Sequence, residues 1–223
     1  MPGTPLREDR IAEEFHVSST PVREAFRRLE FEGWLQSIPY RGCFLRKFSR
    51  DEICEHYQLR EMLEGLAAAS AAQKASPEDI EALRRVIADE KNYIDENSKL
   101  GENAARSSLQ PDFQFHQMIA EISHNTMLQQ RLKMLNAQIS STFILCHSQN
   151  TTIEDNYRVY HEHVMIFSAI ERRWDEAAEV LMRQHIREAK TLFLAIWDQK
   201  EAAEKPIRKR GRKAKQSTPP LSE

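Results

Sequence analysis

Apolar residues near the N-terminus follow two short helical stripes and then two short strands. A first helix is predicted over 7–16, and a second begins at Thr20, a favourable N-cap, with Pro21 as its first residue. The stripes consist of Ile11, Ala12 and Phe15 in the first helix and of Val22, Ala25, Phe26 and Leu29 in the second. Gly33 ends the second helix, and apolar runs on both sides of 39–42 predict a hairpin. Two short helices and a hairpin make a winged helix-turn-helix.

From Ser49 onward the pattern is helical throughout, with no strand-like alternation and no repeat of fixed period. Six helices are predicted, over 51–74, 77–98, 107–124, 126–148, 153–172 and 175–202. The expected fold class is therefore mainly α, with a winged helix-turn-helix over 1–48 and an all-α six-helix bundle over 50–202. Residues 203–223 are basic and low in apolar residues, so we expect a disordered tail.

Composition narrows the class of protein. Charged residues make up 30% of the 223 positions and glycine only 6, which is typical of a soluble helical protein. The chain has no apolar run of bilayer length and no signal-peptide pattern, and its three cysteines are far apart, so we expect a cytoplasmic protein with free thiols and no membrane partner. The net charge of −2 is unevenly distributed, with eight Lys/Arg against three Asp/Glu in 200–223. Contact with nucleic acid should therefore be local.

The polar face of the second helix has the chemistry of a DNA-reading surface. Arg23 and Arg27 lie one turn apart, where they can reach guanine in a major groove. Residues 18–20 can hold phosphate at the helix N-terminus, and Arg41 and Gly42 can approach a minor groove from the hairpin tip. The alternative is a solvated face of i, i+4 ion pairs, in which Arg23, Arg27 and Arg28 pair with Glu24, Glu30 and Glu32. The periodicity alone does not separate the two.

Histidines on three predicted helices of the bundle lie on apolar faces. Asp112 and His116 project from one face of their helix, and His163 and His185 lie on the apolar stripes of two others. Periodicity favours His163 over His161. A single such histidine is usually a satisfied core residue, but three with a carboxylate indicate a divalent metal site, with Zn²⁺ as first candidate and Mn²⁺ or Ni²⁺ as alternatives. The remaining histidines lack this alignment and are interpreted as ordinary residues: His16, His56, His124 and His147.

The segment from Pro2 to Phe48 carries the pattern PG…L.E..IA..F.VS.TPVREA.RRLE.EG and a P.RG turn. It resembles the DNA-binding domain of the GntR family of bacterial transcription regulators. The resemblance implies that Thr20, Arg23 and Gly42 contact operator DNA. The residues expected to contact DNA are Arg7, Ser18, Ser19, Thr20, Arg23, Arg27, Arg41 and Gly42. In two departures, Ser19 stands where the family usually has arginine, and the family's first helix is expected to be missing before Pro2.

The bundle carries LREMLEG (59–65), DFQFH (112–116), the His163 segment with its following AI…DEAA, and HI (185–186). On these motifs it resembles the FCD effector-binding domain of FadR-type GntR regulators, and six helices fit the VanR-like branch. The resemblance implies that a divalent metal binds to Asp112, His116, His163 and His185, and that Arg60 helps to hold a small carboxylate effector. Arg60 could equally be an ion-pair partner of Glu64.

These features predict a DNA-binding transcription regulator, not an enzyme. We expect a homodimer whose affinity for a palindromic operator changes when a small organic acid reaches the metal. One alternative is a metal-dependent hydrolase or decarboxylase on the same ligands, although the sequence has no HExxH, no GxSxG and no evident general base. Another is a metal-binding protein with a vestigial DNA-binding domain. The tail segment KRGRKAK (209–215) resembles an AT-hook, and a generic phosphate-binding or solubilising tail is its alternative.

Overall fold

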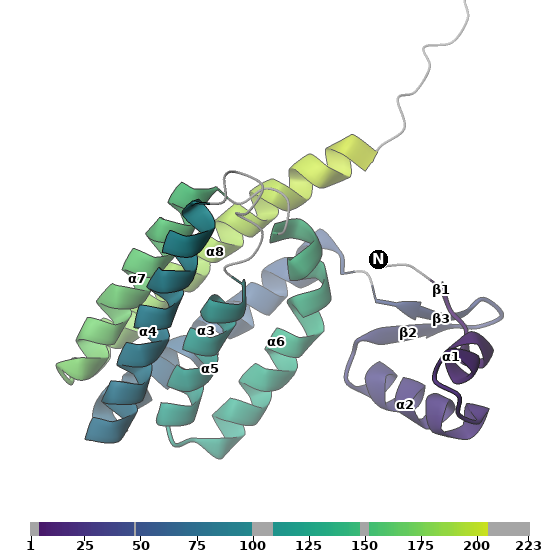
Figure 1. Cartoon of the computed structure of the whole chain (residues 1–223), viewed down its shortest axis with the longest axis horizontal. Helices are drawn as coiled ribbons and strands as arrows, with labels where there is room; N and C mark the ends of the chain where they lie inside the picture. The colour runs from purple at the N-terminus through teal and green to yellow at the C-terminus, as the bar shows by residue number, and fades with distance from the viewer. Residues whose placement is uncertain (1–4, 47, 100–108, 148–151, 205–223) are drawn as a thin grey trace, which may run out of the picture.

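The computed structural model of the chain describes residues 5–46, 48–99, 109–147 and 152–204 (Figure 1). For residues 109, 137–147, 200 and 203–204 it describes the backbone alone. Figure 1 shows a small N-terminal unit beside a bundle of long helices. The AT-hook-like segment and most of the expected tail lie outside the described residues, as do Pro2, Gly3 and the side chain of His147.

The N-terminal unit is a winged helix-turn-helix, as predicted. Its elements are β1 (Pro5–Leu6), α1 (Glu8–Glu14), α2 (Ser19–Phe31), β2 (Leu35–Ile38) and β3 (Gly42–Leu45). The three strands form an antiparallel sheet in the order β1-β3-β2. A small core of Ala12, Val22, Phe26 and Leu35 holds this unit together. Strand β1 was not predicted, because two residues are too short to show the alternation of a strand.

The start of α2 differs from the prediction. The N-cap is Ser18 rather than Thr20, and its side chain makes no capping hydrogen bond. Pro21 is therefore the third helical residue, which the helix tolerates because its first N–H groups have no partner within it. Two residues of the predicted apolar stripes are exposed: Phe15 is the C-cap of α1, and Ala25 lies outside the face that α2 buries.

The six predicted helices of the bundle are confirmed, with ends within two residues of the expected positions. They are α3 (Arg50–Lys74), α4 (Pro77–Ser98), α5 (Leu109–Ile122), α6 (Thr126–His147), α7 (Ile153–Glu171) and α8 (Asp175–Glu204). Three of them begin at capping boxes, formed by Ser49 with Glu52, Ser76 with Asp79, and Thr152 with Asp155. In each box, the side chains of the N-cap and the third helical residue satisfy backbone N–H groups that the helix leaves free.

Helix α3 is the central element of the bundle, in contact with α5, α6, α7 and α8. At Gly65 it lies so close to α8 that an added Cβ would be 2.6 Å from Cγ of Arg183. Just before α3, the Phe48 side chain joins the apolar core of the bundle, so the two units meet at this residue. Among the helices that the structure describes, none is both long and apolar enough to cross a membrane.

Candidate metal centre and nucleic-acid interface

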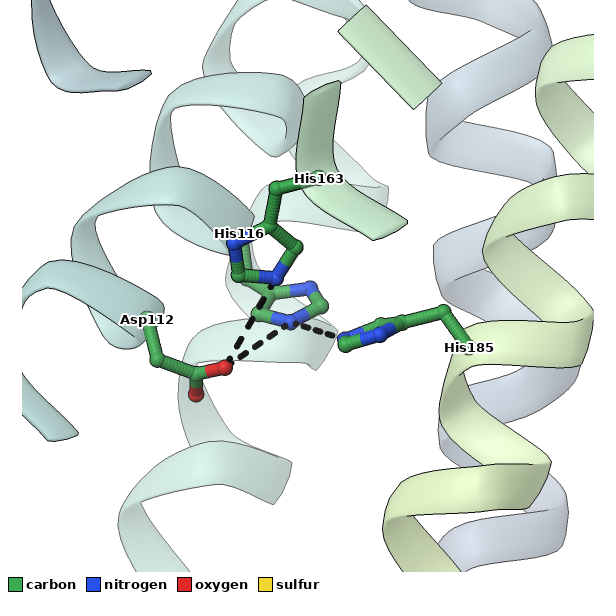
Figure 2. Close-up of side chains that lie close together, drawn as sticks. All are labelled: Asp112, His116, His163 and His185. Atoms are coloured by element: carbon green, nitrogen blue, oxygen red, sulfur yellow. Dashed lines mark hydrogen bonds and ion pairs between the residues drawn. The ribbon is translucent and has the colours of Figure 1, made fainter. Parts of the chain in front are cut away.

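Four side chains with metal-ligand chemistry meet inside the bundle. Figure 2 shows Asp112 and His116 of α5, His163 of α7 and His185 of α8 directed toward one another. One ligand atom from each lies within 4.8 Å of all the others. The Nε2 atoms of His116 and His185 are 3.2 Å apart, and Oδ1 of Asp112 lies 3.7 Å from Nε2 of His163. The structure thus brings together the four residues that the sequence analysis named as candidate metal ligands.

Each imidazole of this cluster has a glutamate on its other nitrogen. The Glu64 carboxylate of α3 contacts Nδ1 of His116. Glu90 of α4 lies 2.9 Å from Nδ1 of His163, and Glu162 lies 2.7 Å from Nδ1 of His185. A carboxylate that accepts the Nδ1–H fixes the ring orientation and leaves the Nε2 lone pair for a ligand bond. These contacts direct the Nε2 side of each ring toward the other side chains of the cluster.

Nε2 of His163 is buried and has no hydrogen-bond partner in the described part of the chain. Burial lowers the pKa of His163 well below its ordinary value, and His185 lowers it further, so the ring is neutral. Burial opposes the ionisation of Asp112, but the positive charge of His116 contributes most to holding its pKa below the ordinary value. His163 and Asp112 are therefore in the forms that bind a cation. At His116 burial opposes protonation, but the Glu64 carboxylate raises the pKa of the ring, so a bound cation would displace its proton.

The centre also holds an excess of carboxyl groups. Two guanidiniums accompany them: Arg60 lies 2.8 Å from Glu64, and Arg158 lies 2.9 Å from Glu162. Burial raises the pKa of Glu90 to about 8, and the charge of Asp112 contributes to this rise. Near neutral pH Glu90 is therefore mostly protonated. A divalent cation between the Nε2 atoms would favour its ionised form and balance the charge of Asp112, so the residues present fit such an ion. The side chain of Asp112 is 23% exposed, whereas the three histidines are buried, so Asp112 is the member of the cluster nearest to solvent.

The residues expected to contact DNA all lie exposed on the N-terminal unit: Arg7, Ser18, Ser19, Thr20, Arg23, Arg27, Arg41 and Gly42. Ser18 to Thr20 form the start of α2, and Arg23 and Arg27 follow one turn apart. In the wing, Gly42 has a φ of 95°, and no described atom lies within 4 Å of a Cβ built on it. This open backbone allows close approach of a partner.

The alternative of i, i+4 ion pairs along α2 holds for Arg28, whose Nε lies 2.9 Å from Glu32. Arg23 pairs instead with Glu8 of α1, at 3.1 Å, and Arg7 pairs with Asp9. These are exposed pairs, which contribute little to stability and open readily. In the described residues Arg27 has no ion pair of this kind.

Comparison with known proteins agrees with both halves of this architecture. The FCD domain family model matches residues 55–188, and the model described as bacterial regulatory proteins, gntR family, matches residues 1–45. The chain belongs to the GntR family. A regulator of this family binds DNA through its helix-turn-helix and is not an enzyme, so the hydrolase or decarboxylase alternative is not favoured.

Relatives of this GntR-type regulator are similar over most of its length. The HTH-type transcriptional repressor RspR of Escherichia coli K12 is 28% identical over 192 residues, covering 84% of this chain and 78% of that protein. The Uxu operon transcriptional regulator of the same strain is 30% identical over 213 residues, covering 86% and 79%. The solved structure of E. coli McbR/YncC has a TM-score of 0.74 at 17% identity, with 88% and 89% coverage, and therefore shows a shared fold.

The glutamates behind the imidazoles are functional candidates of the regulator that the sequence prediction missed. Glu64 was considered only as a partner of Arg60, and that pair is confirmed. Glu90 gave a visible signal, because it lies on the buried stripe of α4 between Ile87 and Ile94. A carboxylate on an apolar stripe requires a buried partner. Glu162 gave no comparable signal, because it is only one residue away from His163 and off its face.

Proposed function

We propose that this GntR-family regulator binds a small organic acid at a divalent metal held by Asp112, His116, His163 and His185, and that the acid changes its affinity for operator DNA. One observation carries the proposal: three buried Nε2 atoms and a carboxylate converge, and each imidazole is oriented by a glutamate. Zn²⁺ suits this ligand set best, with Mn²⁺ and Ni²⁺ as alternatives. The cytoplasm, where chromosomal DNA is found, is the proposed location.

The metal supplies coordination positions for the oxygen atoms of the acid when it is bound. Arg60 is the proposed second contact for the carboxylate. Its Nε and Nη2 atoms bind Glu64, and its guanidinium lies 5.4 Å from the centre of the Tyr57 ring, so its orientation is fixed. Nη1 is the nitrogen that we assign to the effector. Six helices in the FCD-type domain support placement in the VanR-like branch.

The proposed metal and effector are tested on the purified wild-type protein. Elemental analysis should find a bound divalent ion. Operator affinity, measured by fluorescence anisotropy on DNA from upstream of the regulator's own gene, should change on addition of organic acids only when the ion is present. A wild-type protein that neither contains nor takes up a divalent ion would exclude the proposed centre. A response to acids that survives chelation would place the effector elsewhere.

A homodimer completes the proposed function, because two-fold related reading helices match a palindromic operator. The proposed interface is an exposed apolar stripe on α3 formed by Leu59, Met62 and Leu66. Glu61 lies beside it and binds Arg187 of α8 at 2.7 Å, so the same face carries both charge signs. A two-fold dimer would bring this stripe against the same stripe of the second copy, which would bury its apolar side chains. Apolar residues on both sides of α3 further support an occupied outer face.

The double substitution Met62→Lys and Leu66→Lys should convert the dimer to a monomer. Dimerisation would bury the two introduced lysine side chains of each copy in an apolar interface, whereas water hydrates their ammonium groups in the monomer. Light scattering coupled to size exclusion measures the mass. Met165→Lys on α7 is the control, because Met165 is also half-exposed but lies outside the stripe. A double variant that stays dimeric at micromolar concentration would place the interface on another face.

A further inference from the structure

The interior side of α3 carries a line of three polar residues, each one helical turn from the next. They are His56, Arg60 and Glu64, at positions i, i+4 and i+8, and all three are buried. Glu64 contacts His116, so the line starts at the proposed metal centre. From there it runs toward the N-terminal end of α3, with a rise of about 6 Å at each step.

Arg60 and Glu64 are hydrogen-bond partners of each other, whereas the third residue, His56, has a ring nitrogen without a partner among the described residues. Arg60 binds Glu64 at 2.9 Å. The His56 side chain is only 5% exposed, and its Nε2 atom has no hydrogen-bond partner among the residues that the structure describes. Burying a polar atom without a partner costs about 1–3 kcal/mol. Folded proteins rarely accept that cost unless a water or a ligand completes the hydrogen bond.

The His56 ring is also in the right charge state to bind an uncharged or anionic group. Burial lowers the pKa of His56 to about 4, and the positive charge of Arg60 contributes to this lowering. The neutral imidazole can donate or accept a hydrogen bond, depending on its tautomer. The line therefore offers a cation at Arg60 and a neutral hydrogen-bonding group one turn further along the same side of the helix.

We infer that His56 is a second recognition residue for the effector, and that the effector is an acid with another oxygen-bearing group beyond its carboxylate, toward the N-terminal end of α3. The carboxylate lies at the metal and Arg60, and the distal hydroxyl, carbonyl or second carboxylate binds Nε2 of His56. This inference rests on the proposed function and narrows its ligand class. A simple fatty acid of the same length would leave the His56 nitrogen unpaired.

The test compares two acids that differ only in a distal hydroxyl, 5-hydroxypentanoate and pentanoate. Calorimetric titration of the metal-loaded, full-length protein measures the two dissociation constants. The wild type should bind the hydroxy acid about tenfold more tightly, which is the ratio expected for one buried hydrogen bond. In His56→Leu the ratio should fall to about one, while pentanoate binds as in the wild type. His56→Met serves if the leucine variant does not fold.

Two outcomes would overturn the assignment of His56. One is a metal-loaded wild type that binds the two acids equally, or binds neither; a buried water then satisfies the nitrogen. The other is a preference for the hydroxy acid that survives in His56→Leu or His56→Met. Metal content is measured on every sample. Loss of metal from the wild type contradicts the proposed function, whereas equal binding to a metal-loaded wild type contradicts only the role of His56.

Discussion

His116→Ala should lose the divalent ion and, with it, the stabilisation that the ion provides. His116 contributes one of three converging Nε2 atoms. Nε2 of His185 lies 3.2 Å away, but it is itself one of the proposed ligands and so cannot take the place of His116. Binding to the folded state alone stabilises a protein by about 3–4 kcal/mol at metal concentrations 100 to 1,000 times the dissociation constant. The melting temperature with added metal should therefore fall by several degrees relative to the wild type. Elemental analysis and thermal unfolding with and without chelator measure both effects.

Two further variants make this experiment specific. His161→Ala removes an exposed histidine from α7, two residues from His163, and should retain the metal. Glu90→Gln keeps every ligand but weakens the hydrogen bond to His163, so metal affinity should fall by about 10- to 100-fold without vanishing. Equal metal content in His116→Ala and His161→Ala would show that the four converging side chains do not form the binding site.

Arg23→Ala should lower operator affinity by about 1–3 kcal/mol, or roughly 5- to 150-fold. Arg23 lies exposed on α2, and its exposed pair with Glu8 can open when DNA approaches. If it reads a base, the loss should depend on the operator sequence; if it binds phosphate, the loss should be similar on all sequences and the salt dependence should weaken. Anisotropy titrations at several salt concentrations on operator and scrambled DNA separate the two cases.

Arg28→Ala is the matched control on the same helix. Arg28 pairs with Glu32 one turn further along α2, away from the helix N-terminus. Its loss removes the same charge from the protein but should reduce affinity only slightly. If Arg23→Ala and Arg28→Ala bind operator equally well, overall charge rather than a reading helix determines affinity. An Arg23→Ala protein with full affinity would contradict the DNA contact.

Much of the fold and of the centre could be predicted because the pattern is periodic and long. Six helices of 14 to 30 residues show their apolar stripes over several turns. The same periodicity placed His163 on the buried side of α7 and His161 on the exposed side, as the structure has them. Convergence of ligands from three helices was predicted because three histidines on apolar faces of one bundle have few other places to meet.

What the sequence could not supply depends on contacts between distant segments. Pairing of Glu64 with His116, and of Glu90 with His163, joins helices whose relative rotation no periodicity determines. Strand β1 exists only because Pro5 and Leu6 pair with β3. His56 was interpreted as an ordinary residue, since its buried position beside Arg60 follows from how α3 packs and not from its own stripe. Local propensity contains no information about any of these long-range contacts.

Each side of helix α3 makes a different kind of contact, and these contacts limit the substitutions that the helix tolerates. Its interior holds the polar line, its exposed face holds the apolar stripe, and Gly65 lacks room for a methyl group beside Arg183. Few positions, such as Asp51, Glu55 and Gln58, remain open to exchange. Across the family, we therefore expect sequence divergence to concentrate on other helices and at single sites such as His56. New effector specificity would then arise by point substitution, while the other residues of α3 stay unchanged.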